Sequence, residues 1–179
     1  MIKSEDSIVI LIDVQGKLAE LMHEKQQLNK QLKILLQGAR ILDIPILWLE
    51  QYPQGLGPTV PEIAAVIDGL EPIDKTCFSA CGSQLFQQRL QASGRHTAIV
   101  AGIESHVCVY QTARDLLASG FTVEVVRDAV SSRTLANHLA GLERMSHLGA
   151  GITTVEMLLF EWLREAGSPA FKEVSRLVR

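Results

Sequence analysis

The sequence predicts a three-layer α/β domain, in which a mostly parallel six-stranded sheet carries helices on both faces. Short β-branched apolar runs alternate along the chain with longer stretches of helical periodicity. The runs stay apolar at successive positions, which is typical of strands buried on both faces. Right-handed crossovers in a doubly wound, Rossmann-like topology give the strand order 3-2-1-4-5-6 and make the first and fourth strands neighbours.

The predicted strands share a short apolar core bounded by polar residues, Gly or Pro. They are expected at Ser7–Ile12, Ile44–Leu49, Glu71–Thr76, Thr97–Ala101, Phe121–Val126 and Gly151–Thr154. The third is the weakest, because it contains Pro72 and charged residues.

The predicted helices share apolar residues at helical spacing, ended in several cases by glycine. They are expected at Lys17–Leu42, Pro61–Ile67, Ser83–Gln91, Cys108–Ser119, Ser132–His147 and Val155–Ala166. The Gly- and Pro-rich segment Gln51–Pro61 is expected to be a long loop. We interpret residues 1–179 as a single domain. A C-terminal helix over about residues 168–179 either packs on that domain or lies at an interface.

The composition excludes several classes of protein. The net charge is −3 with no long run of one sign, which argues against nucleic acid or an anionic membrane as partner. No stretch approaches the roughly 20 apolar residues of a membrane helix, and the N-terminus lacks a secretory signal. There are only three cysteines, an odd and small number, which argues against a disulfide scaffold and suits a reducing compartment. We therefore expect a cytoplasmic protein.

The strand order predicts where a ligand would bind. In doubly wound sheets, ligands bind at the carboxyl ends of the strands where the winding reverses. The first strand ends at Asp13, and the fourth is followed by the segment 102–108, which ends in Cys108. The alternation and the assumed order therefore bring Asp13 and Cys108 together.

Each of these residues has an ordinary and a functional interpretation. Cys108 precedes a predicted helix, whose N-terminal amides would favour a nucleophilic thiolate, although a lone cysteine is often only a small apolar side chain. Asp13 is either a helix N-cap or a proton acceptor for the thiol. Lys75 would stabilise the thiolate if it lay near Cys108, but spacing alone does not place it there.

No metal or nucleotide motif is present. The five histidines form no metal-ligand cluster, and Cys77 and Cys81 lack a second ligand pair, so we interpret these two cysteines as packing residues. Neither a GxGxxG nor a GxxxxGK[ST] motif occurs. We expect no metal and no cofactor.

Three motifs together resemble the isochorismatase-like cysteine hydrolase family over nearly the whole chain. They are ILIDVQ at 10–15, KTCFS at 75–79 and GIESHVCV at 102–109. The loop EQYPQGLGPTVPE at 50–62 is most similar to the isochorismatase-domain-containing branch. Nicotinamidases of the family carry histidine metal ligands between the first two motifs, and this chain has no histidine between His23 and His96.

The resemblance implies a catalytic triad of Asp13, Lys75 and Cys108. It also implies a cis peptide bond between Ile103 and Glu104, with the backbone amides of Glu104 and Cys108 forming an oxyanion hole. Isochorismatase chemistry does not need a nucleophilic cysteine, so Cys108 favours hydrolysis of an amide-type C–N bond through an acyl-thioester, with Asp13 as general base and acid.

The substrate is expected to be an unidentified small molecule. On position alone, the candidate pocket walls are Gln15, Gln51, Tyr52, Phe78 and Tyr110. The family resemblance implies a homo-oligomer. Two alternatives stay open: a catalytically silent or redox-responsive binding protein on the same fold, and a flavodoxin-like nucleotide-binding module.

Overall fold

The computed structural model describes residues 1–179 and contains one six-stranded parallel sheet in the order β3-β2-β1-β4-β5-β6. The strands are β1 (Ser7–Ile12), β2 (Ile46–Gln51), β3 (Ile73–Lys75), β4 (Thr97–Ile103), β5 (Thr122–Ser131) and β6 (Gly151–Thr153). The order confirms the predicted doubly wound topology. All residues of β1 and β4 are buried, as expected for central strands covered on both faces.

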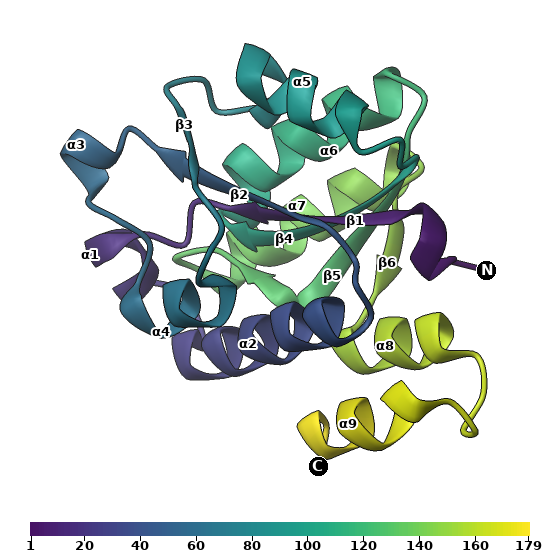
Figure 1. Cartoon of the computed structure of the whole chain (residues 1–179). Helices are drawn as coiled ribbons and strands as arrows, with labels where there is room; N and C mark the ends of the chain where they lie inside the picture. Colours follow the sequence, from purple (N-terminus) through teal and green to yellow (C-terminus); the bar gives the residue numbers. More distant parts are fainter.

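Helices cover both faces of the sheet (Figure 1). They are α1 (Gly16–Glu20), α2 (Lys25–Ile41), α3 (Pro53–Leu56), α4 (Pro61–Ala64), α5 (Gln84–Ala92), α6 (Tyr110–Ala118), α7 (Leu135–His147), α8 (Val155–Leu163) and α9 (Pro169–Leu177). One apolar core joins the sheet to α2, α4, α8 and α9. A second joins the opposite face to α5, α6 and α7.

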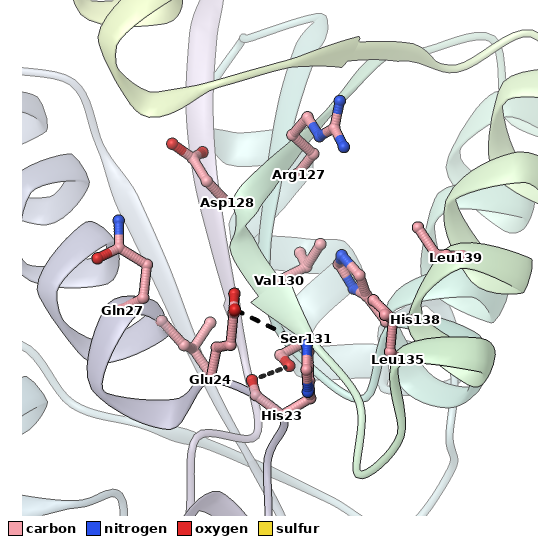
Figure 2. A pocket seen from close by; sticks show the side chains of 11 residues that line it. His23, Glu24, Gln27, Arg127, Asp128, Val130, Ser131, Leu135, His138 and Leu139 are labelled. Atoms are coloured by element: carbon pink, nitrogen blue, oxygen red, sulfur yellow. Dashed lines mark hydrogen bonds and ion pairs between the residues drawn. The ribbon is translucent and has the colours of Figure 1, made fainter.

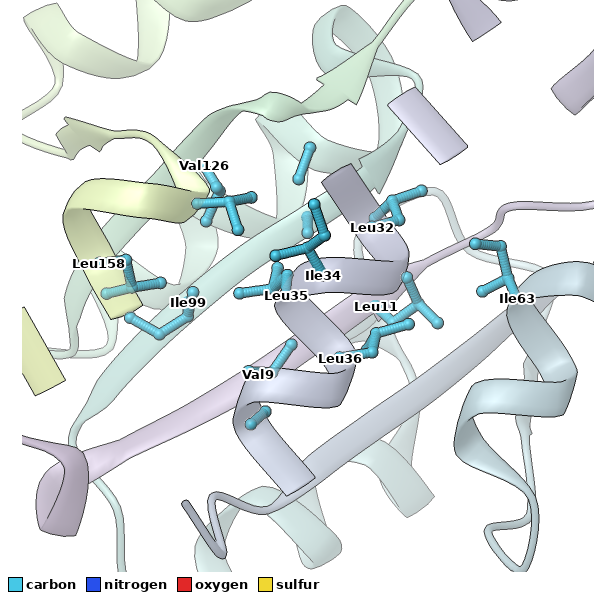
Figure 3. Packing of buried hydrophobic residues seen from close by; sticks show 14 of the residues in the cluster. Val9, Leu11, Leu32, Ile34, Leu35, Leu36, Ile63, Ile99, Val126 and Leu158 are labelled. Atoms are coloured by element: carbon cyan, nitrogen blue, oxygen red, sulfur yellow. The ribbon is translucent and has the colours of Figure 1, made fainter. Parts of the chain in front are cut away.

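Successive side chains along a strand point alternately into one core and the other. Val9 and Leu11 of β1 face α2, where Leu32, Leu35 and Leu36 pack against them (Figure 3). Ile8, Ile10 and Ile12 point to the other face. The leucine spacing that predicts α2 therefore marks its buried side.

Several predicted boundaries were wrong. The expected helix Lys17–Leu42 is two helices, because Glu24 takes a left-handed conformation with φ of 51° and separates α1 from α2. The expected loop Gln51–Pro61 contains the short helix α3. The helix expected from Ser132 begins at Leu135, because β5 continues to Ser131 and Thr134 caps α7.

The C-terminal helix packs on its own chain. Val174 of α9 is fully buried in the core that contains α2 and α8, and the Phe171 ring meets Phe160 of α8 edge-on. No helix combines the length and the apolar character needed to cross a membrane.

Candidate active site

Asp13 lies at the carboxyl end of β1, at the centre of the sheet. Its φ of 54° turns the chain out of the strand, and its side chain is 2% exposed. Its neighbour Ile12 lies beside Gly102 of β4, where any side chain would collide, because a Cβ there would stand 2.1 Å from the Ile12 carbonyl oxygen. This close backbone contact fixes Asp13 relative to the loop that follows β4.

Lys75 is the last residue of β3, and its side chain reaches Asp13. Its Nζ donates to Asp13 Oδ2 at 2.7 Å, to Gln51 Oε1 at 2.6 Å, and to the carbonyls of Cys77 and Phe78, both at 3.2 Å. The Lys75 side chain is fully buried. Although β3 is two strands away from β1, the side chain spans the gap, which spacing in the sequence does not reveal.

Cys108 lies in a π-helical turn, Ser105–Val109, that joins β4 to α6. It is 7% exposed and packs in the core under α6. Burial, and then the negative charge of Asp13, raise the pKa of the Cys108 thiol to about 12. The expectation of a thiolate favoured by a helix N-terminus was therefore wrong: α6 begins only at Tyr110, and burial and the Asp13 charge keep the thiol protonated at neutral pH.

One oxygen of the Asp13 carboxylate is hydrogen-bonded and the other is not. Oδ2 accepts from Lys75, whereas Oδ1 is buried without a hydrogen-bond partner. Burial raises the pKa of Asp13, while the Lys75 ammonium and the Cys108 thiol oppose the rise. A buried, unpaired carboxylate oxygen near a protonated thiol is a suitable acceptor for the thiol proton.

The segment before Cys108 supplies a free backbone donor. The peptide bond between Ile103 and Glu104 is cis, and the Glu104 N–H donates no hydrogen bond within the protein. The Glu104 side chain is held by Arg133, whose backbone N and Nε donate to its Oε2 at 3.0 and 3.1 Å.

The predicted pocket walls fall into two groups. Gln15 is fully buried, and its amide bonds only to backbone atoms of Gln51 and Gly57, so it joins the end of β2 to the residue after α3 and faces no open space. Gln51 bonds to Lys75 and so supports the ion pair.

The three aromatic residues are more open. Tyr52 and Phe78 are 54% and 55% exposed, on the loops after β2 and β3. Tyr110 lies at the start of α6, where a hydrogen bond from Arg144 lowers the pKa of its hydroxyl.

Two surface cavities flank this centre. One, of about 360 Å³, is lined by Tyr52, Gln54, Lys75 and Cys77. The other lies between α2 and α7, with His23, Glu24, Arg127 and His138 as polar groups (Figure 2). Neither is lined by Asp13 or Cys108. No three His, Cys, Asp or Glu side chains gather where they could hold a metal ion.

Sequence reasoning missed the residues that hold the segment Glu104–Cys108, which we call the catalytic loop. Arg133 bonds to Glu104, His138 to Ser105, and Ser132 to His106. All three partners follow β5. The only available signal was that β5 neighbours β4, which brings the segment after each strand to the same edge of the sheet.

The raised pKa of Cys108 predicts a pH-dependent contribution to stability. Above pH 9 the unfolded chain releases this thiol proton, whereas the folded protein keeps it until about pH 12, so folding loses stability as pH rises through this window. At pH 10, one unit above the reference pKa, the loss is about 1 kcal/mol. Chemical denaturation of wild type and Cys108→Ala at pH 7 and pH 10 measures it. A difference between the two proteins that is the same at both pH values would contradict the assignment.

Known sequences match nearly the whole chain. The sequence profile of the isochorismatase domain matches residues 7–157. Isochorismatase domain-containing protein 2A of Mus musculus is 40% identical over 98% of this chain and 84% of its own length. Isochorismatase domain-containing protein 2 of Danio rerio is 38% identical over 99% of this chain and 89% of its own length.

Solved structures agree with these relatives. The MAR1 ribonuclease of Caenorhabditis elegans is 38% identical and superposes with a TM-score of 0.93, over 99% of this chain and 91% of that one. The YcaC gene product of Escherichia coli, described as an octameric hydrolase of unknown specificity, is 27% identical with a TM-score of 0.88, over 92% and 83% of the two chains.

Proposed function

This chain belongs to the isochorismatase domain family, and from that premise we propose that it is a cysteine-dependent hydrolase of a small-molecule amide. The observation that carries the proposal is the buried Lys75–Asp13 ion pair, whose free Asp13 oxygen is close enough to Cys108 for the two groups to shift each other's pKa. A fully buried ion pair at the end of a sheet is a costly arrangement. Activation of a buried thiol would explain its presence.

We propose that in the resting state the thiol is protonated and that the Lys75 ammonium keeps Asp13 ionised against the effect of its burial. The raised pKa of Cys108 disfavours a free thiolate, so proton transfer to Asp13 Oδ1 accompanies attack on the substrate. The Lys75 ammonium holds Asp13 Oδ2 throughout and balances its charge. The attacking sulfur thereby becomes nucleophilic as Asp13 takes its proton.

The attack forms a bond from Sγ to the carbonyl carbon, and the carbonyl π electrons move to oxygen. The unpaired N–H of Glu104, together with the Cys108 N–H, would donate to this oxyanion. Asp13 then returns the proton to the nitrogen of the leaving amine as the C–N bond breaks. The product of this half-reaction is an acyl-thioester on Cys108.

Hydrolysis of the thioester reverses the roles. Asp13 takes a proton from water, the hydroxide adds to the acyl carbon, and the same amides hold the second oxyanion. The C–S bond breaks and the sulfur regains the proton from Asp13. The sum is amide plus water giving carboxylic acid plus amine.

The exposed rings of Tyr52 and Phe78 and the partly buried ring of Tyr110 lie on loops or helix ends near the same edge of the sheet, and we propose that they form the substrate pocket. We also propose a homo-oligomeric assembly, since the Escherichia coli relative is described as octameric.

A phosphodiester substrate is suggested by the name of the Caenorhabditis elegans relative, a ribonuclease. The net charge of −3 gives this chain no electrostatic attraction for a polyanion, so we favour a small amide.

Asp13→Asn tests the proposal. We expect kcat/KM on the best substrate of a small-amide panel to fall about 10²–10⁴-fold, the range attributed to a general base. Cys108 should remain reactive to iodoacetamide, because loss of the Asp13 charge lowers the pKa of the thiol. Release of ammonia or amine and peptide mapping of the label measure the two effects.

Asp43→Asn is the matched control, because Asp43 also has a positive φ, of 53°, but is exposed. It should behave as wild type. Turnover by Asp13→Asn within a few-fold of wild type would contradict the assigned base. Rapid labelling of Cys108 without hydrolysis of any amide would instead support the silent binding protein.

A further inference from the structure

The segment Ser131–Gly141, from the end of β5 to the middle of α7, makes four contacts with three successive residues of the catalytic loop. Glu104 accepts from Arg133, as described above. Ser105 Oγ lies 3.0 Å from His138 Nδ1, and His106 Nδ1 lies 3.0 Å from Ser132 Oγ. We call Ser131–Gly141 the supporting segment.

The fourth contact is between two backbones. A Cβ on Gly141 would stand 2.8 Å from both the carbonyl carbon and the carbonyl oxygen of Ser105, and 2.9 Å from the His106 nitrogen. Only a residue without a side chain allows α7 to approach the loop so closely. The loop is therefore held against a helix as well as by hydrogen bonds.

These contacts hold the residue that carries the proposed oxyanion donor and the residue that follows it. The free N–H belongs to Glu104, whose own carboxylate is held by Arg133, and the next residue, Ser105, is held by His138. The Glu104 side chain is only 8% exposed, so solvent does little to stabilise its charge. The Arg133 guanidinium is the group that balances this charge. Fixing the side chains of Glu104 and Ser105 restrains the rotation that would turn the N–H away.

We propose that Arg133 and His138 are positioning residues for the oxyanion donor of Glu104. This inference rests on the proposed thiol hydrolase function. Neither residue touches the reacting atoms, and both act through the catalytic loop. His138 also borders the cavity between α2 and α7, whose other charged and titratable groups are His23, Glu24, Arg127 and Asp128 (Figure 2).

Two reactions of the same thiol separate positioning from general stability. Alkylation by iodoacetamide displaces iodide at a saturated carbon and creates no oxyanion. Addition of butanal forms a bond from Sγ to the aldehyde carbon, the thiol proton passes to Asp13 Oδ1, and the carbonyl oxygen becomes an alkoxide. The Glu104 N–H donates to this charged oxygen in the hemithioacetal, so the affinity for butanal depends on that donor being in place.

In Arg133→Met and His138→Ala we expect the dissociation constant for butanal to rise about tenfold, below the 10²–10³ that loss of a whole oxyanion donor costs. The alkylation rate of Cys108 should stay within about twofold of wild type. The conservative variants Arg133→Lys and His138→Asn, which keep a hydrogen-bonding group near the same place, should recover part of the butanal affinity. Arg164→Met, which removes an exposed arginine paired with Glu5, should change neither reaction.

Three results would overturn the inference. The first is an affinity for butanal that is the same in Arg133→Met and His138→Ala as in wild type. The second is an equal fall in both reactions without recovery in the conservative variants, which marks a structural role only. The third is a wild-type protein that is alkylated at Cys108 but forms no adduct with butanal, because then no oxyanion donor is in place. Failure of the proposed function itself is distinguishable, because it would show as the absence of amide hydrolysis by wild type, which neither the butanal affinity nor the alkylation rate measures.

Discussion

Lys75→Met is expected to lower the free energy of unfolding by about 3–5 kcal/mol, the cost of leaving one member of a buried ion pair without its partner. The Lys75 ammonium contacts Asp13 Oδ2, the Gln51 side chain and two backbone carbonyls, and its side chain has no exposure to solvent. A methionine of similar length fills the space but donates to none of these acceptors.

The loss should depend on pH. Without Lys75, the pKa of Asp13 rises further, because burial remains and the opposing ammonium is gone. At low pH the carboxyl can take a proton and the penalty shrinks, so the variant should lose less stability at pH 5 than at pH 8.

Two further variants test the cause. Lys33→Met removes a lysine whose side chain is 39% exposed and 3.5 Å from Glu62, and it should change stability by at most about 0.5 kcal/mol. Asp13→Asn added to Lys75→Met removes the unpaired charge and should recover part of the loss. Urea denaturation measures all four proteins. A Lys75→Met protein within about 1 kcal/mol of wild type would contradict the account of the ion pair.

Cys108→Ala is expected to abolish hydrolysis, with a loss in kcat on the order of 10⁶-fold, the scale found when the nucleophile of a serine hydrolase is removed. No other thiol is expected to substitute, because Cys77 lines the cavity beside Tyr52 and Cys81 lines a cavity beside α5, and Asp13 lines neither. Burial also raises the pKa of Cys81, to about 11.

Cys108→Ser keeps the shape of the side chain and should also be inactive, since the hydroxyl is a weaker nucleophile with the same buried base. Cys81→Ala is the matched control and should retain wild-type turnover. Initial rates of amine release check all three. Residual activity of Cys108→Ala above about a tenth of wild type would show that another group performs the attack.

The sheet could be predicted because its signal is local and strong. β1 and β4 are continuous apolar runs, so their bounds follow almost directly from the sequence, and their pairing follows from the doubly wound order. The break between α1 and α2 could not be predicted, because Glu24 is an ordinary helix-forming residue that takes a positive φ in this tertiary setting.

The site could be predicted only in part. The meeting of Asp13 with the loop that carries Cys108 follows from strand order, whereas the reach of Lys75 across two strands depends on side-chain length and burial. The state of the thiol was predicted wrongly, because the sequence shows that a helix follows but not that the thiol is buried beside a carboxylate. Arg133 and His138 have no local signal, since their partners lie about 30 residues earlier.

The most direct test of the central claim is the mass of the enzyme during turnover. Wild type mixed with an amide substrate and quenched in acid within the first turnovers should gain the mass of the acyl group, and peptide mapping should place it on Cys108. Cys108→Ala should gain nothing. Steady hydrolysis with no covalent adduct at any time, or an adduct on another residue, would contradict the assignment of Cys108 as the nucleophile.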